Sequence, residues 1–546
     1  MEEKTFCQNW GSSIYFIANL LNFVLATAVF TIPFPMHEVG IFLGTIILAI
    51  TCFISVVACT FIIESLALKN AILKQENSIL ERAILENEQE QKDLLDKEEK
   101  GEEQKEEGLI NKEKEKDKDR PTFISKTSLA SNIEEIQNDK DSKKELLNQD
   151  DDNLIKGNVP DEDIIERSNT LYIYKRFEIS KLSESLPKLG YYFVVLTIIF
   201  YLYIGVTSNG IIAGNNLKDI IGKTIGIEMP GYSYYIIVVC FFIITIIIAL
   251  NNIKHLKKFS MFIMIMRFVI IFLILGSCFY SMGKYGVASF KNIPKFDISN
   301  ITVMIGNSLF VFMSHHSIPG MVENFTPQKR LIKLLIIGYL FSLLFIVVYS
   351  YVGLFAFADP TYSCDKEHPF PIAIQSTFSS NFLGLPVIGY IINYYPILNV
   401  ITSGMQLITL RNNILEAIAG CSRELSRKLN FAEQPGFFSL VKNFGFNTVV
   451  ALPPIAIGLS LQNIQSLMKY FSSILGFLLM LVVPVLVVER YRSLFNKRKY
   501  QFTDLNRSFL TNKYGTIFII FMSVVIFSLI IFGFIKNTNN KTCVNE

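Results

Sequence analysis

Long apolar runs are the feature that most limits how this chain can fold. Hydrophobic residues make up 51% of the 546 residues. Many stretches hold enough of them in a row to cross the hydrocarbon core of a bilayer, which takes about 20 residues, and backbone groups in that core must bond within helices. The sequence therefore predicts an all-α polytopic membrane protein with about eleven transmembrane helices. They cover residues 13–34, 40–66, 188–213, 232–250, 259–281, 300–321, 331–358, 382–410, 446–461, 465–488 and 514–536.

The basic residues between these runs predict the orientation. Connections on one side of the membrane carry about three times as many Lys and Arg residues as those on the other, and the positive-inside rule places the richer side in the cytosol. The N-terminus then lies in the cytosol and the C-terminus outside, which agrees with an odd number of spans. The sequence leaves the plasma membrane and an endolysosomal membrane both open.

A long charged connection separates the second run from the third. Residues 67–185 are dominated by Lys, Glu, Asp, Gln and Asn, and such a segment cannot bury enough apolar surface to offset its ordering entropy. We expect a mostly disordered cytosolic insert, which could bind a protein partner. It divides one membrane domain into a segment at residues 1–66 and a segment at residues 186–546.

The start of the insert has a helical pattern of its own. Leu73, Leu80 and Leu94 fall on one heptad position, but Asn87 interrupts them. A short coiled coil and a solvated charged helix or linker are both open at this point.

The first run has a composition that a simple membrane anchor does not need. Between Asn22 and Pro33 it holds a polar amide, small residues at Ala26 and Ala28, and two threonines. Small residues let a backbone or a ligand approach closely, and Thr and Asn can bond to backbone groups that are freed where a helix breaks. We interpret the stretch as an interrupted helix that faces a solute. The alternative is a tightly packed, continuous helix.

The sixth run contains a second polar interruption. Within Met313–Gly320, His315 and His316 are flanked by serines at bilayer depth, where polar groups are costly unless they face water, a partner or a ligand. Pro319 should prevent a regular helix from continuing. Adjacent residues of a helix point about 100° apart, so the two histidines do not form a chelating pair. They either line a solute path or a proton-sensitive gate, or bond to backbone carbonyls at the break.

These two interruptions lie in the first and the sixth spans. If spans one to five and six to ten are repeats, an odd number of spans inverts the second repeat, as in transporters whose midplane site is built from broken helices. Exposed N–H groups at a break attract a carboxylate, and exposed carbonyl groups attract a cation. Such a site suits a zwitterionic amino acid.

The eighth run offers a candidate ion site. Thr402 and Ser403 stand side by side before Gly404, which would open the backbone, and their hydroxyl groups could supply oxygen ligands to Na⁺ opposite the first run. The alternative is structural, because Ser and Thr in membrane helices commonly bond to the carbonyl four residues back.

Other charged groups and motifs point to no further site. Arg267, in the fifth run, is expected to extend toward the cytosolic interface, and Glu64, near the inner end of the second run, reads as an interface carboxylate. A net charge of +3 is too small to indicate nucleic-acid binding. The sequence has no metal-type Cys/His spacing and no HExxH, Walker or GxSxG motif. We expect no enzymatic activity, no metal site and no cofactor other than Na⁺ as a coupling ion.

Several of these stretches resemble a known family. Residues 22–33 are similar to the first-helix signature of the amino acid/auxin permease family, which includes the sodium-coupled neutral amino acid transporters. Residues 61–71, 312–319 and 410–413, together with the long insert, resemble its transmembrane protein 104 branch. The resemblance covers all the spans but not the insert. It implies a LeuT-type fold, with a five-plus-five inverted repeat and broken helices 1 and 6, that works by alternating access.

The same resemblance assigns residues to a site. Substrate would bind at the two breaks, and a cation would bind between the first and eighth spans. Relatives usually have Gly where this chain has Ala26, and often where it has Ala28; a methyl group there narrows the pocket and makes unwinding harder. The residue types and this resemblance together give the predicted site. The substrate-binding residues are Leu25, Ala26, Thr27, Ala28, Val29, Ser314, His315, His316 and Ser317, and the ion-coupling residues are Asn22, Thr402 and Ser403.

Together, these features predict a secondary active transporter of amino acids, coupled to Na⁺ or to H⁺. The alternative function is a non-transporting amino acid sensor or scaffold that keeps the transporter fold and signals through the insert.

Overall fold

A computed structural model describes most of the membrane part of the chain. It covers residues 2–74, 173–227, 229–250, 253–291, 293–322, 325, 328–357, 374–430, 437–497, 508 and 513–542. The chain divides into two units, and the larger comprises Met1–Asn70, Leu171–Tyr500 and Asp504–Glu546. Most of the predicted insert at 67–185, with Leu80, Asn87 and Leu94, lies outside the described residues, as do the disorder and the coiled coil predicted there.

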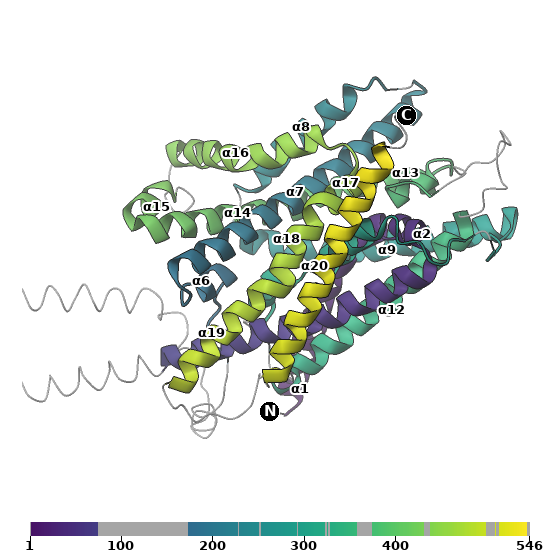
Figure 1. Ribbon diagram of the computed structural model, residues 1–546. Coiled ribbons are helices and arrows are strands. Elements are labelled where there is room, and N and C mark those ends of the chain that lie inside the picture. The colour runs from purple at the N-terminus through teal and green to yellow at the C-terminus, as the bar shows by residue number, and fades with distance from the viewer. Residues whose placement is uncertain are drawn as a thin grey trace, which may run out of the picture. The chain divides into compact units, whose positions relative to one another are not determined.

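The larger unit is built from helices (Figure 1). Its first part comprises α1 (Glu2–Thr31), α2 (Pro33–Val39), the helix Ile41–Lys74 as far as Asn70, α6 (Ile179–Ser183), α7 (Lys188–Ile225), α8 (Ser233–Ile248) and α9 (Ile253–Tyr285). The next part comprises α10 (Ile301–Val311), the 3₁₀ turn η1 (His315–Ser317), α11 (Ile318–Val322), η2 (Gln328–Arg330), α12 (Leu331–Phe357), η4 (Phe378–Phe382), α13 (Ile388–Tyr394), η5 (Tyr395–Leu398), α14 (Asn399–Cys421) and α15 (Arg423–Leu429). The last part comprises α16 (Phe437–Ser460), α17 (Ile464–Leu467), the π turn η7 (Met468–Ser472), α18 (Ser473–Phe477), the π turn η8 (Leu478–Val482), α19 (Val483–Lys497) and α20 (Lys513–Thr542).

Nine helical segments of the described residues are long and apolar enough to cross a membrane. Each matches one of the predicted runs. The other two runs correspond to α8, an apolar helix of 16 residues, and to the segment from α13 through η5 to α14. The structure thus confirms a helical, multi-pass membrane protein.

The first helix is not interrupted where the sequence predicted a break. α1 continues through residues 25–29 to Thr31, and the chain bends only at Ile32, before α2. Alanine has the highest helix propensity of all residues, so Ala26 and Ala28 favour a continuous helix where glycine would favour unwinding. The bend follows from Pro33, which lacks the N–H group needed to continue the helical bonds.

The sixth span is interrupted as predicted, but the break lies earlier than Pro319. α10 ends at Val311, residues 312–314 are irregular, and η1 leads into α11. Pro319 does not stop a helix, because it is the second residue of α11. In the first turn of a helix a missing N–H group leaves no bond unmade.

Side chains of neighbouring helices bond to the backbone that this break frees. The carbonyl group of Phe312 accepts hydrogen bonds from Ser55 Oγ at 2.7 Å and from the Tyr339 hydroxyl at 3.1 Å. The same hydroxyl also contacts Ser314 Oγ and lies 3.3 Å from Cys59 Sγ. Tyr339 is fully buried, so its hydroxyl is the centre of a water-excluded polar network.

We expect Tyr339→Phe to lower the free energy of unfolding by about 1–3 kcal/mol, because the loss of this hydroxyl removes a partner from several buried polar groups. Thermal unfolding of the purified protein in detergent measures the change. Tyr280→Phe, at an exposed position of α9, is the matched control and should leave the melting temperature almost unchanged. Equal melting temperatures for the two variants would contradict this role of Tyr339.

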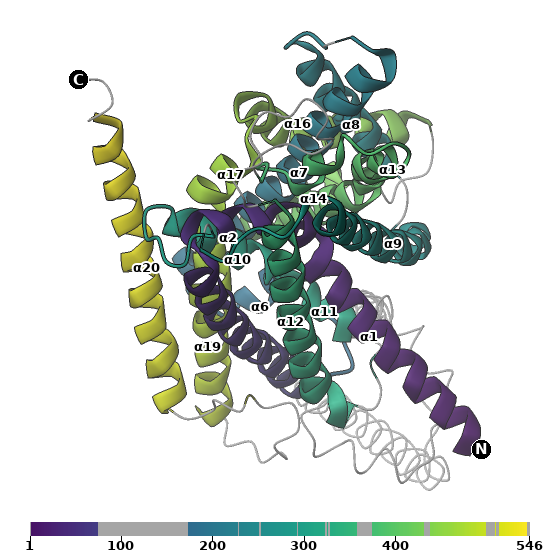
Figure 2. The same cartoon turned by 90° about the vertical axis from the view of Figure 1, so that its right-hand side faces the viewer.

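The helices that enclose the cavity described below form two groups. All residues of α10 are buried, and it packs against α1, α18, η7 and α20. α7, α8, α14 and α16 pack against one another in a second group, while α9 contacts α1 and α12 as well as α14. Figure 2 shows α1, α10 and α12 on one side and the second group on the other. Because α9 contacts both groups, its side chains can extend into the space between them.

Candidate solute-binding site

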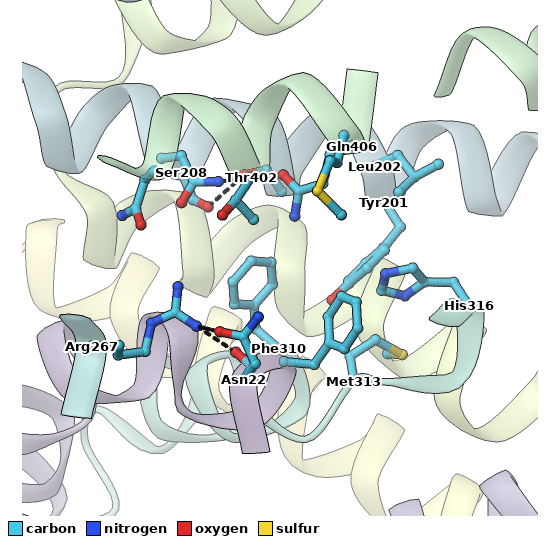
Figure 3. A pocket seen from close by; sticks show the side chains of 15 residues that line it. Asn22, Tyr201, Leu202, Ser208, Arg267, Phe310, Met313, His316, Thr402 and Gln406 are labelled. Atoms are coloured by element: carbon cyan, nitrogen blue, oxygen red, sulfur yellow. Dashed lines mark hydrogen bonds between the residues drawn. The ribbon is translucent and has the colours of Figure 1, made fainter. Parts of the chain in front are cut away.

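A cavity lies between these two groups of helices (Figure 3). Its walls come from α1, α7, α9, α10, η1 and α14. The cavity volume is about 60 Å³, where one water molecule requires about 10–15 Å³ on this scale. The cavity therefore has room for several water molecules or a small solute.

A buried arginine forms one end of the cavity. Arg267 of α9 is 3% exposed, and its Nη1 donates to the backbone carbonyl of Asn22 at 2.6 Å and to Asn22 Oδ1. Its Nε donates to the Tyr395 hydroxyl at 3.0 Å. The expectation that Arg267 reaches the membrane interface is therefore wrong. Its guanidinium is held inside the protein by polar oxygens of α1 and η5.

The wall opposite Arg267 is polar and comes from α7 and α14. Figure 3 places Ser208, Thr402 and Gln406 across the cavity from Arg267 and Asn22. Asn209 Nδ2 donates to Gln406 Oε1 at 3.3 Å, which joins the two helices. The wall thus presents hydroxyl and amide groups, which can bond to a ligand as donors or as acceptors.

The two hydroxyl groups predicted to bind an ion have different positions. Thr402 lines the cavity, whereas Ser403 is buried outside its walls, and its Oγ has no hydrogen-bond partner among the described residues. Gly404 does not open the backbone, since α14 is continuous there; a Cβ atom at Gly404 would lie 2.5 Å from Ile248 Cγ2. This glycine allows α14 to approach the residue that ends α8.

The other end of the cavity is aromatic. The ring centroid of Tyr201 lies 5.8 Å from those of His316 and Phe310, and the ring of Phe23 lies 6.0 Å from that of His316. His316 Nδ1 and both ring nitrogens of His315 have no hydrogen-bond partner among the described residues. The cavity therefore has a cationic end at α9 and an aromatic end at the break in the sixth span.

The structure brings only some of the predicted site residues to this cavity. Asn22, His316 and Thr402 line it. Leu25, Ala28 and Val29 are buried in α1 but do not line it, and the side chains of Ala26 and Thr27 lie outside the described residues. Ser314 belongs to the Tyr339 network, while His315 and Ser317 also lie outside the lining set.

The residues of α7 that line the cavity were not predicted from the sequence. Tyr201, Gly205, Ser208 and Asn209 all line the cavity from α7. Their spacing of four, three and one residues places them on one face of the helix, a period that the sequence does contain. Gln406 repeats this pattern on α14, four residues after Thr402.

Comparison with known proteins bears on the region that carries this cavity. The sequence profile of the family described as transmembrane amino acid transporter protein matches residues 183–535. The Transmembrane protein 104 homolog of Dictyostelium discoideum is 24% identical over 528 residues, 93% of each chain. The Drosophila melanogaster homolog is 24% identical over 196 residues, 35% of this chain and 36% of the relative. Human Transmembrane protein 104 is 21% identical over 206 residues, 36% of each chain.

These matches confirm the resemblance to the amino acid permeases and to the transmembrane protein 104 branch. The residues that match the family profile include α7, α9, α10 and α14, which supply most of the cavity walls. The chain therefore belongs to the transmembrane amino acid transporter protein family.

Proposed function

We propose that this protein is a secondary active transporter that carries amino acids by alternating access, with the cavity as its substrate site. The observation that carries the proposal is Arg267. Its Nε and Nη1 are bonded to neutral oxygens, and among the described residues no carboxylate pairs with it and nothing accepts a hydrogen bond from Nη2. A cation in a membrane span is costly without an anionic partner. The carboxylate of a substrate would complement it through a charge-assisted hydrogen bond.

The opposite end suggests which amino acids fit. Tyr201, Phe310 and Phe23 offer an apolar and aromatic surface to the part of the solute that points away from Arg267. Between the two ends, the hydroxyl and amide groups of Ser208 and Gln406 could accept hydrogen bonds from an ammonium group. A small neutral amino acid with an apolar side chain suits this arrangement.

The wider architecture is part of the same proposal. We propose eleven spans in a five-plus-five inverted repeat, with α8 and the α13–α14 segment as the two spans beyond the nine long apolar helices. The N-terminus would lie in the cytosol and the C-terminus outside, in the plasma membrane or an endolysosomal membrane. A gradient of Na⁺ or H⁺ would drive transport, and the insert would be available to a protein partner.

Filling the cavity should block transport. We expect Gly205→Leu to reduce uptake of a transported amino acid into proteoliposomes about fivefold or more, since overpacking costs about 1–3 kcal/mol and each 1.4 kcal/mol is a factor of ten. A Cβ atom at Gly205 would lie 3.4 Å from the Gln406 side chain and not against backbone. The added side chain can therefore extend into the cavity without displacing a helix.

Uptake is measured with a panel of amino acids under imposed Na⁺ and pH gradients. Leu196→Phe, at an exposed position on the same helix, is the control and should transport like the wild type. Melting temperatures of all three proteins separate blocked transport from misfolding. Full uptake by a folded Gly205→Leu protein would show that the solute passes elsewhere.

One observation favours the sensor or scaffold as a second candidate function. α1 remains helical through residues 25–29, so backbone groups that an unwound first helix offers to a substrate are bonded within the helix. A sensor would be stabilised against heat by an amino acid that it does not transport. Stabilisation without flux for every amino acid in the panel would decide for that function.

A further inference from the structure

Arg267 also bears on the ion that drives transport. Within the part of the chain that the structure describes, its guanidinium is bonded to three oxygen atoms: the Asn22 carbonyl, Asn22 Oδ1 and the Tyr395 hydroxyl. Neutral carbonyl and hydroxyl oxygens are also the ligands that hard cations such as Na⁺ take from proteins. The guanidinium is therefore bonded to the same kinds of oxygen atom that would bind a coupling cation.

The family resemblance assigns Asn22 of the first span to cation coupling together with Thr402, which lies across the cavity from it. Both oxygens that Asn22 could offer to an ion accept a hydrogen bond from Nη1 of Arg267. A Na⁺ ion on these oxygens would lie beside a fixed positive charge. Two unit charges about 4 Å apart in a protein-like dielectric repel strongly enough to weaken binding about a thousandfold.

We propose that the Arg267 guanidinium takes the place of a coupling Na⁺ ion, so that the protein binds no Na⁺ at Asn22 and Thr402 and transports without a Na⁺ gradient. The residues present do not fit Na⁺ while Arg267 is in place. The guanidinium joins α1 to α9 and η5 through its own hydrogen bonds, which is the bridging that an ion between helices would otherwise supply. The claim that transport needs no Na⁺ gradient rests on the proposed transport function. The claim that no Na⁺ binds at Asn22 and Thr402 can be tested by binding alone.

The binding half is tested on the purified full-length protein with Na⁺ itself as the probe. Binding of radiolabelled Na⁺, and melting temperatures in NaCl, KCl and choline chloride at equal ionic strength, compare four proteins: wild type, Arg267→Lys, Arg267→Ala, and Arg267→Ala combined with Thr402→Val. We expect no saturable Na⁺ binding by the wild type or by Arg267→Lys, which keeps the charge. We expect binding and Na⁺-specific stabilisation in Arg267→Ala, and loss of both in the double variant.

Saturable Na⁺ binding by the wild type or by Arg267→Lys would overturn the proposal. A folded Arg267→Ala protein that binds no Na⁺ would overturn it as well, because the oxygens would then not form a cation site. If Arg267→Ala fails to fold, Arg267→Met, which removes the charge and keeps more of the side-chain volume, takes its place in the same comparison.

Transport distinguishes this inference from the function on which it rests. Equal amino acid uptake in NaCl and in choline chloride supports both. Uptake that requires Na⁺ overturns the role of Arg267 and leaves the transporter in place. Absence of uptake for every amino acid overturns the transporter, while Na⁺ binding by the four proteins still tests the site.

Discussion

Gly306→Ala should lower the free energy of unfolding by about 3 kcal/mol or more, or prevent folding altogether. A Cβ atom at Gly306 would lie 2.2 Å from the carbonyl oxygen of Met468, 2.9 Å from its carbonyl carbon and 3.4 Å from the backbone nitrogen of Ser473. These are backbone atoms of η7 and α18, so no side chain can rotate out of the way. Because every residue of α10 is buried, the helix also cannot move toward open space.

The effect is measured by thermal unfolding and by the yield of monodisperse protein in detergent. Gly276→Ala is the matched control, since Gly276 lies within α9 and nothing stands within 4 Å of the added Cβ atom. That variant should be as stable as the wild type or more stable by up to about 1 kcal/mol, because alanine favours the helix. Gly306→Ala with the stability of Gly276→Ala would mean that α10 and η7 are not in this close contact.

The close approach of α10 to η7 illustrates what the sequence could and could not predict. The apolar runs predicted the membrane helices because a bilayer leaves the backbone few alternatives. The contact between Gly306 and Met468 joins residues that are far apart in the chain, and nothing local to either one signals the other. The π turns η7 and η8 likewise depend on packing against neighbouring helices, so the run at residues 465–488 was predicted only as one uninterrupted span.

The two predicted interruptions show where local reasoning succeeded and where it failed. In the sixth span, polar residues with Pro319 predicted a break, and a break is present between Val311 and His315. In the first span, the break expected at residues 25–29 is absent. The departure from glycine at Ala26 and Ala28 already favoured a continuous helix by propensity. In that span the alternative of a packed, unbroken helix is the one observed.

The residues of the candidate site were also only partly predicted from the sequence. Asn22, His316 and Thr402 were identified as polar groups in apolar runs, and all three line the cavity. Arg267 was misassigned because an isolated arginine in a span usually extends to the interface. Its partners are 245 residues earlier and 128 residues later in the chain. The chemistry of each residue could be read from the sequence, but the pairing of residues on different helices could not.

Glu64 is the second residue whose partner the sequence did not reveal. It is 2% exposed, and its carboxylate accepts hydrogen bonds from Arg492 Nε at 2.9 Å and Nη2 at 2.8 Å and from the backbone N–H of Ser508 at 3.0 Å. The sequence predicted an ordinary interface carboxylate and gave no sign of this buried ion pair. The pair joins the helix Ile41–Lys74 to α19 and to the chain just before α20.

Glu64→Ala should lower the free energy of unfolding by about 3–5 kcal/mol, because it leaves the charge of Arg492 largely buried without its bidentate partner. Thermal unfolding in detergent measures the loss. Glu489→Ala is the matched control: Glu489 pairs with Nη1 of the same arginine at 2.9 Å, but its side chain is 46% exposed. A solvated pair contributes about 0–1 kcal/mol, so this variant should lose far less stability.

A double variant identifies the cause of the loss. Removal of both charges in Glu64→Leu with Arg492→Met should restore much of the stability that Glu64→Ala loses, because apolar side chains of similar size commonly replace a buried ion pair at little cost. Glu489 partly compensates Arg492 when Glu64 is absent, which sets the loss nearer the lower end of the expected range. A double variant no more stable than Glu64→Ala would show that the bond from Ser508 to Glu64, and not the unpaired charge, dominates the effect.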